Sequence, residues 1–400
     1  MQEEWIDTSR RVCVSIKLFC LIILLGISLS LFARIHHVGT NQKYSSLTQA
    51  ISVTIPGDTI MIHKGVYPGG LSFINLQGKA DKLVYIISAP SESVIFNGGS
   101  TGWHMTDVAY IQIEKIIFQQ QTGNGFNIDD GGSYSTPSHH IVFDSCIFRD
   151  INAGGNNDLL KMSGVDFFEI KNCIFLNGSK SGSGIDMVGC HEGLIRNNRF
   201  ENQGANSIQT KGGSNNIRIE YYFFKQGGQR ALNLGGSTGM HFFRPADVRY
   251  EAAALKVYSN IFIGSDVPVA FVGCIESQVV NNTIYLPDKW VIRILQETVD
   301  TSRFYACGNN SFKNNIIYRD NRVANDCNVG ANTNPKSFHF SGNLWYHSHN
   351  SNWIGPNLPV ADINCIIGKD PLFNNASFDD FSLKESSPAA GKGFNYIMQK

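Results

Sequence analysis

The sequence predicts an all-β fold in which short coils of chain stack on one another to form a solenoid. Two observations carry this prediction. An asparagine-centred motif recurs along the chain, and a run of alternating apolar and polar residues recurs inside the same period. The composition agrees, because Gly is frequent (39 residues), charged residues make up only 16%, and runs of helix-forming residues are rare. Such a composition favours strands joined by tight turns.

The asparagine motif reads apolar, polar, Asn, Asn and then apolar or aromatic, as in LIRNNRFEN (194–202) and QVVNNTIYL (278–286). Most copies lie 22–28 residues apart, a period that indicates a solenoid when the composition is of β type. We expect the asparagines to stack at one turn, where their amides bond between coils and Asn tolerates the left-handed backbone. The aligned second positions are Cys146, Cys173, Asn198, Tyr222, Asn260, Asn282, Asn315 and Asn343.

The second strand register is clearest in GIDMV (184–188), SIQTK (207–211) and ALNLG (231–235). Apolar residues alternate with polar ones, so every second side chain should point into the core. A single coil cannot bury its apolar face, but coils stacked at about 4.8 Å can. Each coil should therefore contain at least two short strands.

Both ends of the repeat region carry characteristic segments. VGTNQKYSSLTQAISVTIPGDTIMIHKGVYPG (38–69) predicts a short helix, then Pro-Gly-Asp and a first strand ending in Gly-x-Tyr, and DPLFNNASFDDFSLKESSPAAGKG (370–393) is the exit segment. With the repeat, these segments resemble the right-handed parallel β-helix, or pectin-lyase-like, superfamily. The resemblance implies one β-helix domain over residues 35–400, with about ten coils and a short N-terminal capping helix. The fold hosts lyases, hydrolases, isomerases and non-enzymatic surface proteins.

Residues 1–34 have a different character. Three basic residues precede an apolar run from Leu18 to Ala33, which is typical of a secretory signal with cleavage after Ser30. Alternatively, residues 12–32 stay as a membrane anchor, since they are nearly long enough to span a bilayer. Either interpretation predicts a secreted, periplasmic or cell-surface protein whose membrane contact is confined to this segment.

The charge and cysteine content exclude several classes of protein. Lys plus Arg and Asp plus Glu both number 33, which argues against a nucleic-acid-binding protein, because those carry a basic excess. Seven cysteines follow the N-terminal segment, and an odd number argues against a disulfide scaffold. Cys307 and Cys327 flank one insertion and could pair in an oxidising compartment. CxxC spacings are absent, so no zinc site is predicted and no cofactor is identified.

The outward residues of the second register form a polar strip. A flat polar strip along stacked coils suits an extended sugar chain, so we expect its polar members to bind substrate on one exposed face. The alternative is an ordinary solvated sheet face, on which Lys161 pairs with Asp186 for little energy. The first column contains Asn127, Lys161, Asp186, Gln209, Asn233, Ala270 and Arg293. The neighbouring column contains Asp129, Ser163, Val188, Lys211, Gly235, Val272 and Leu295.

Two insertions lie beside this strip. The longer one, GGSTGMHFFRPADVRYEAAAL (235–255), carries His241 and Arg244, which we expect it to bring towards the strip. Long loops on a solenoid often build its binding face. The other, residues 127–142, supplies Asp129, Asp130, His139 and His140. Alternatively, both are variable loops packed over the helix wall.

The segment SIQTKGGSNNIRIEYYFFKQGGQRALNLGGSTG (207–239) weakly resembles alginate lyases and chondroitinase B. The resemblance places Lys211 on the catalytic lysine of that group and Asn215 or Asn216 on its asparagine. Gly235 and Gly236 replace its Arg-His pair, so Arg244 or Arg249 would have to substitute. The glutamates that hold calcium in that group are missing here.

A lyase acting on a uronic acid polymer must neutralise the carboxylate and remove the C5 proton with a Lys, Tyr, His or Arg side chain. Lys211, Arg244, His241 and Tyr250 are therefore the candidate catalytic residues, and Arg249 joins the strip as a candidate for substrate binding. We expect a monomer that acts on or binds an acidic polysaccharide. The alternatives are a non-catalytic surface or adhesion β-helix, and a glycoside hydrolase using paired carboxylates from Asp129, Asp130 or Asp186.

Overall fold

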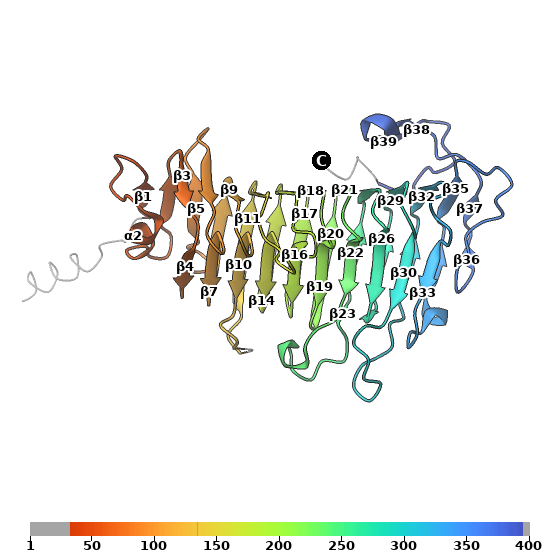
Figure 1. Ribbon diagram of the computed structural model, residues 1–400, viewed down its shortest axis with the longest axis horizontal. Helices are drawn as coiled ribbons and strands as arrows, with labels where there is room; N and C mark the ends of the chain where they lie inside the picture. Colours follow the sequence, from red (N-terminus) through yellow and green to blue (C-terminus); the bar gives the residue numbers. More distant parts are fainter. Residues whose placement is uncertain (1–32, 134, 395–400) are drawn as a thin grey trace, which may run out of the picture. The chain divides into compact units, whose positions relative to one another are not determined.

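The computed structural model describes residues 33–133 and 135–394, and this part of the chain forms a right-handed parallel β-helix (Figure 1). Strands make up 45% of the structure and helices 4%, so the predicted fold class is confirmed. Each complete coil contributes one strand to each of three parallel sheets, one more than the minimum expected from the sequence.

The first sheet has fifteen strands within the described residues. Along the stack they are β1 (Ile35–Val38), β2 (Thr59–Ile62), β5 (Val84–Ser88), β8 (Ala109–Glu114), β11 (Ser138–Asp144), β14 (Val165–Lys171), β17 (His191–Arg196), β20 (Ser214–Glu220), β24 (Lys256–Tyr258), β28 (Gln278–Val280), β31 (Ser311–Lys313), β34 (His339–Ser341) and β36 (Asp362–Ile363). The short strands β23 (Ala252–Ala253) and β27 (Cys274–Ile275) pair beside this path.

The second sheet has twelve strands and the third has ten, counted over the same described residues. The second sheet contains β3 (Gly65–Pro68), β6 (Val94–Asn97), β9 (Ile116–Gln119), β12 (Ile147–Arg149), β15 (Ile174–Leu176), β18 (Arg199–Glu201), β21 (Phe223–Lys225), β25 (Ile261–Ile263), β29 (Thr283–Tyr285), β32 (Ile316–Arg319), β35 (Leu344–His347) and β37 (Ile366–Ile367). The third contains β4 (Leu71–Ile74), β7 (Trp103–Thr106), β10 (Phe126–Asp129), β13 (Leu160–Ser163), β16 (Ser183–Val188), β19 (Asn206–Lys211), β22 (Arg230–Gly235), β26 (Val267–Val272), β30 (Ile292–Leu295) and β33 (Cys327–Val329).

The core is built from side chains that repeat at equivalent positions in successive coils. Phenylalanines facing inward from the second sheet stack in a column, with ring centroids 4.5 Å apart between Phe175 and Phe200 and 4.8 Å apart between Phe224 and Phe262. These rings are fully buried. Each coil therefore buries its apolar face against its neighbours, as the period-two pattern predicts.

The asparagine turns form the predicted ladder. The first Asn of the motif takes the left-handed conformation, with φ 56° at Asn281 and 51° at Asn314. The second Asn is buried and bonds to the next coil: the backbone N–H of Asn282 donates to Asn315 Oδ1 at 2.8 Å, and its Nδ2 donates to the same oxygen at 3.0 Å. Because the positions stack in register, the expected interpretation of the motif is confirmed.

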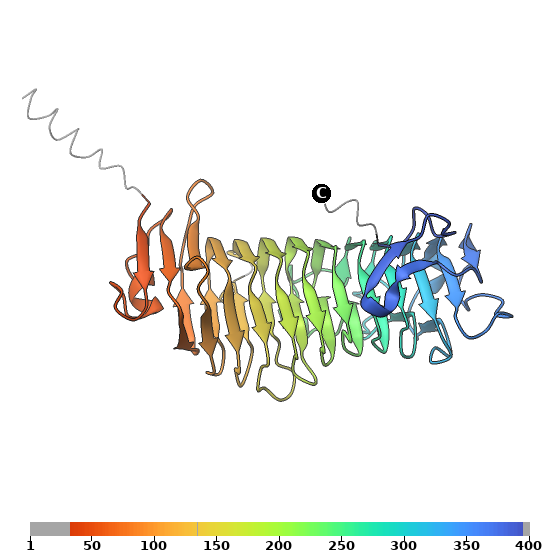
Figure 2. The ribbon, with the colours of Figure 1, turned by 90° about the horizontal axis from the view of Figure 1, so that it is seen from above.

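The two ends of the helix differ. The predicted capping helix is α2 (Leu47–Ile51), whose N-cap Ser46 accepts a hydrogen bond from the backbone of Gln49. The exit segment forms an antiparallel hairpin of β38 (Phe373–Asn375) and β39 (Asp380–Leu383). It lies outside the stack, above the coils in Figure 1 and in front of them in Figure 2, and is tied to β21 by a Lys225–Asp379 ion pair of 2.9 Å.

Cys307 and Cys327 are both buried free thiols, so the suggested disulfide is wrong. Cys327 begins β33 in the third sheet, whereas the residue after Cys307 bonds to Cys274 beside the first sheet, and the two thiols belong to different walls.

The expected signal or anchor falls on residues outside the described part. No helix among the described residues is long and apolar enough to cross a membrane.

Candidate functional site

The predicted polar strip is a register column of the third sheet. Asn127 aligns with Lys161, Lys161 with Asp186, Asp186 with Gln209, and Gln209 with Asn233. The neighbouring column departs from the expected alignment at one place. The register shifts between Gln209 and Thr210, so Thr210 rather than Lys211 aligns with Gly235.

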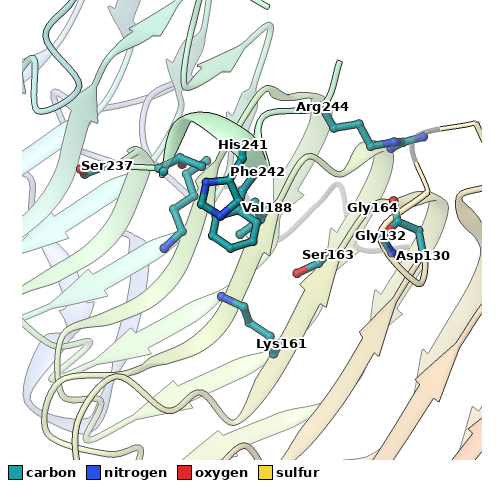
Figure 3. A pocket seen from close by; sticks show the side chains of 13 residues that line it. Asp130, Gly132, Lys161, Ser163, Gly164, Val188, Ser237, His241, Phe242 and Arg244 are labelled. Carbon is teal, nitrogen blue, oxygen red and sulfur yellow. The ribbon is translucent and has the colours of Figure 1, made fainter. Parts of the chain in front are cut away.

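A pocket of about 520 Å³ lies over strands β13, β16 and β19. Lys161, Ser163 and Lys211 line its floor. His241 and Phe242 stand on one side, and Asp130 with its glycine neighbours stands on the other (Figure 3). Both insertions noticed in the sequence therefore border the strip. The longer one includes the short 3-10 helix η1 (Met240–Phe242).

Beneath the pocket floor, two buried carboxylates meet two lysines. Lys161 Nζ contacts Asp186 Oδ2 directly and lies 3.7 Å from Asp158 Oδ2. Lys211 Nζ lies 3.3 Å from Asp186 Oδ1 without hydrogen-bond alignment. Asp186 is only 1% exposed and the Lys211 side chain 13%. The expectation of an exposed strip with Lys211 pointing to solvent is therefore wrong, because the flanking insertions and the lysines themselves cover it.

Burial controls the protonation of this cluster. Burial, together with the charge of Asp186, raises the pKa of Asp158 to about 7. Burial would lower the pKa of Lys161, but attraction to Asp186 and Asp158 outweighs it and raises that pKa. Lys161 is therefore held as a cation. Near neutral pH the two lysines therefore face Asp186 and a carboxyl group that is partly protonated, Asp158.

Arg244 anchors the long insertion. Its Nη1 and Nη2 donate to the two carboxylate oxygens of Asp166, each at 2.7 Å, and Nη1 also donates to the Gly189 carbonyl at 2.9 Å. Burial raises the pKa of Asp166, but hydrogen bonds from Arg244 and His191 outweigh it and lower that pKa to about 2. Arg244 does line the pocket as expected, yet both ends of its guanidinium are engaged by the first sheet. This geometry fits an anchor better than a cation available to substrate.

Glu251 is a second anchor. Its buried carboxylate accepts from the backbone of Gly212 and of Thr238, both at 2.9 Å, and from the Thr238 hydroxyl at 2.7 Å. The hydroxyl of Thr298, in the loop between β30 and β31, also donates to it. Glu251 thus ties the turn after Lys211 to two loops through hydrogen bonds.

The loop side of the pocket is aromatic. Phe242 is 58% exposed, and its ring centroid lies 3.9 Å from that of His241. An aromatic face carries partial negative charge and attracts the polarised C–H groups of a sugar ring. Opposite, burial raises the pKa of Asp130, which favours its neutral form.

Several predicted residues lie elsewhere. Tyr250 packs beside Phe243 and accepts from Asn215 Nδ2 at 3.3 Å, and neither Tyr250 nor Asn215 lines the pocket. Arg249 stacks over the Tyr305 ring at 4.3 Å.

The remaining strip and insertion residues also lie outside the pocket lining. The Asn233 side chain is buried, and its Oδ1 accepts a hydrogen bond from Arg230 Nη1 at 3.1 Å. Asn233 is therefore not on an exposed face. Asn127 lies one strand before Lys161 and donates to Asp129 Oδ2 at 2.9 Å. The His139–His140 pair belongs to β11 of the first sheet.

Sequence reasoning missed Asp158, Asp166 and Glu251. Asp158 precedes its strand and so falls outside the alternating pattern, although it lies three residues before Lys161. Asp166 bonds to Arg244, which lies 78 residues further along the chain. Glu251 bonds to residues that are at least 13 positions away. No local sequence pattern reveals partners at such separations. Within residues 33–133 and 135–394, no group of three or more His, Cys, Asp or Glu side chains is arranged to hold a metal ion.

Comparison with solved structures bears on the fold. Pectate lyase Pel9A superposes with a TM-score of 0.52 at 15% identity, covering 89% of this chain and 90% of that enzyme. The chain shares the β-helix fold of that lyase. An alginate lyase from Paenibacillus sp. (16% identity, TM-score 0.48, 84% and 99% of the two chains) and a rhamnogalacturonan lyase (13%, 0.48, 87% and 98%) are also similar. At such identities the likeness is one of fold. No protein-family model and no curated protein sequence matches the chain.

Proposed function

We propose that the pocket binds a polysaccharide containing uronic acids and cleaves it by β-elimination. The observation that carries the proposal is the convergence of Lys161 and Lys211 in one pocket, over carboxylates that are themselves buried. An ammonium group at a pocket floor attracts a carboxylate ligand, and an amine beside it can act as a base. The proposal includes the export expected from residues 1–34, since such polymers lie outside the cytoplasm.

The contacts distinguish the roles of the two lysines. Lys161 bonds to Asp186, approaches Asp158 and has a raised pKa, so it would stay charged and neutralise the substrate carboxylate. Lys211 has the looser contact with Asp186, so we assign it as the base. In its amine form it would take the C5 proton while the C4–O bond breaks and the C4=C5 double bond forms. The leaving oxygen takes a proton from His241 or from water.

The rival functions fit this geometry less well. A hydrolase needs two carboxyl groups that flank the scissile bond. Of its three candidates only Asp130 lines the pocket: Asp186 is buried behind Lys161, and Asp129 accepts from Asn127 outside the lining. A spacer protein would leave the strip as paired charges on a convex wall. The Lys161–Asp186 pair is present, but it lies under a pocket that two insertions border. Depth and aromatic lining favour a ligand site.

A screen of the purified protein against uronic acid polymers tests the proposal, with ultraviolet absorbance of the unsaturated product as the readout. Activity should appear on at least one polymer and be lost in Lys211→Ala. Lys171→Ala is a matched control, because Lys171 also pairs with two carboxylates, Asp144 and Glu169, but on the first sheet. Absence of both binding and cleavage across the screen would leave the spacer function as the better account.

A further inference from the structure

The outer face of the third sheet is open on one side of the pocket and closed on the other. Towards β7 the strip continues through Asn127 to His104, whose side chain is 43% exposed. Towards β26 it disappears: Asn233 is 3% exposed, and Ala270 and Val272 are fully buried although they face outward. Their inward neighbours belong to the main core, so something outside the sheet covers this end.

Two layers make up the cover. The first layer is the long insertion, which passes next to Lys211 at Gly236. A Cβ added to Gly236 would lie only 3.3 Å from Lys211 Cβ. From there the insertion continues through Thr238 along the edge of the pocket. Beyond it, Arg230 Nη2 bonds to Glu297 Oε1 at 2.7 Å across the strip. A separate apolar cluster lies under this layer and contains Val267, Ala270, Val272, Leu295 and the partly buried Trp290. Both columns of the strip are therefore interrupted one strand after Lys211.

This cover is firmly attached. Glu251 joins Gly212, Thr238 and Thr298, and so links the turn after Lys211 to both loops of the cover. Arg244 ties the same insertion to Asp166 on the first sheet. Buried charged hydrogen bonds of this kind are expensive to break, because the partner left behind stays buried and unpaired. The cover is therefore a wall and not a lid that opens to admit a chain.

We propose that the pocket recognises the end of a polysaccharide chain and releases short products of one size. The inference rests on the proposed function and specifies its mode of action. A chain lying along the coils would have its terminal residue against the wall beside Lys211 and Gln209. The rest would leave over Lys161 and Asn127 towards His104, four ladder steps or roughly 19 Å from β19. A chain that continued in both directions would collide with the Arg230–Glu297 pair.

The test follows product length over time on a uronic acid polymer that the protein cleaves, and on oligomers of defined length labelled at one end. One short product should dominate from the earliest time points, while the mean length of the remaining polymer falls slowly. A spread of intermediate lengths at early times would overturn the chain-end inference and leave the lyase proposal intact. Absence of cleavage and binding would overturn both.

A wall variant gives a second measurement. Arg230→Ala combined with Glu297→Ala opens the strip as far as Asn233, so the product distribution should shift towards longer products. The matched control is Arg199→Ala with Glu201→Ala, an ion pair on the second sheet that should leave the distribution unchanged. Thermal unfolding verifies that both double variants fold. An unchanged distribution in a folded wall variant would contradict the role of this pair.

Discussion

Replacement of one ladder asparagine, Asn282→Leu, tests the physical basis of the fold. Asn282 Oδ1 accepts from the backbone N–H of Asn260 at 2.9 Å and from Asn260 Nδ2 at 2.8 Å. Its own Nδ2 donates to the Val257 and Val280 carbonyls, at 3.2 and 3.1 Å, and to Asn315. Leucine has a similar volume but no polar group. The variant therefore removes hydrogen bonds without leaving a large cavity.

The magnitude follows from the groups left behind. The Asn260 N–H becomes a buried donor without a partner, and one such group costs about 1–3 kcal/mol. The carbonyls keep a second lone pair for other donors and lose little, so the unpaired N–H dominates and we expect a loss of about 1–3 kcal/mol. Urea unfolding followed by circular dichroism measures it.

The exposed Asn352→Leu is the control and should change the free energy of unfolding by less than about 0.5 kcal/mol. An Asn282→Leu variant as stable as the wild type would refute the structural role of the ladder. Normal stability combined with loss of sugar binding would further show that the ladder is a ligand site.

Three further outcomes are expected. Lys211→Ala should lower turnover by about 10²–10⁴-fold with little change in stability, measured by initial rates and urea unfolding; unchanged rates would exclude it as the base. Because the folded-state pKa of Asp158 is raised to about 7 from the ordinary 3.8, its contribution to the free energy of unfolding should be greatest below pH 3.8 and be lost as the pH rises through 7. Asp158→Asn should remove that part of the pH dependence in urea unfolding, and an identical pH profile would contradict the assignment. Arg244→Ala leaves the half-buried Asp166 with His191 as its remaining partner, so it should cost up to about 3 kcal/mol and speed amide exchange in residues 236–250; slow exchange there would show that other contacts hold the loop.

The sequence alone determined the coil and its register. Parallel coils stack in line, so residues one period apart occupy equivalent positions, and a motif such as that around Asn282 and Asn315 can be aligned by eye. The same rule places Lys161, Asp186 and Gln209 in one column from the alternating pattern alone. The loop beside that column could be expected from its length, and it does bring His241 to the strip.

The tertiary structure decided how deep the strip lies and which charges act together. Whether Asp186 is exposed depends on what folds over it, and the insertions have no period that would fix their path. Tyr250 and Arg249 point away from the pocket because they pack in the base of their loop, and Cys307 and Cys327 lie on separate walls. Asp158, Asp166 and Glu251 gain their roles from partners that are distant in sequence. Stacking in register is a local, repeated interaction that a pattern records, whereas an insertion takes its shape from single contacts made once.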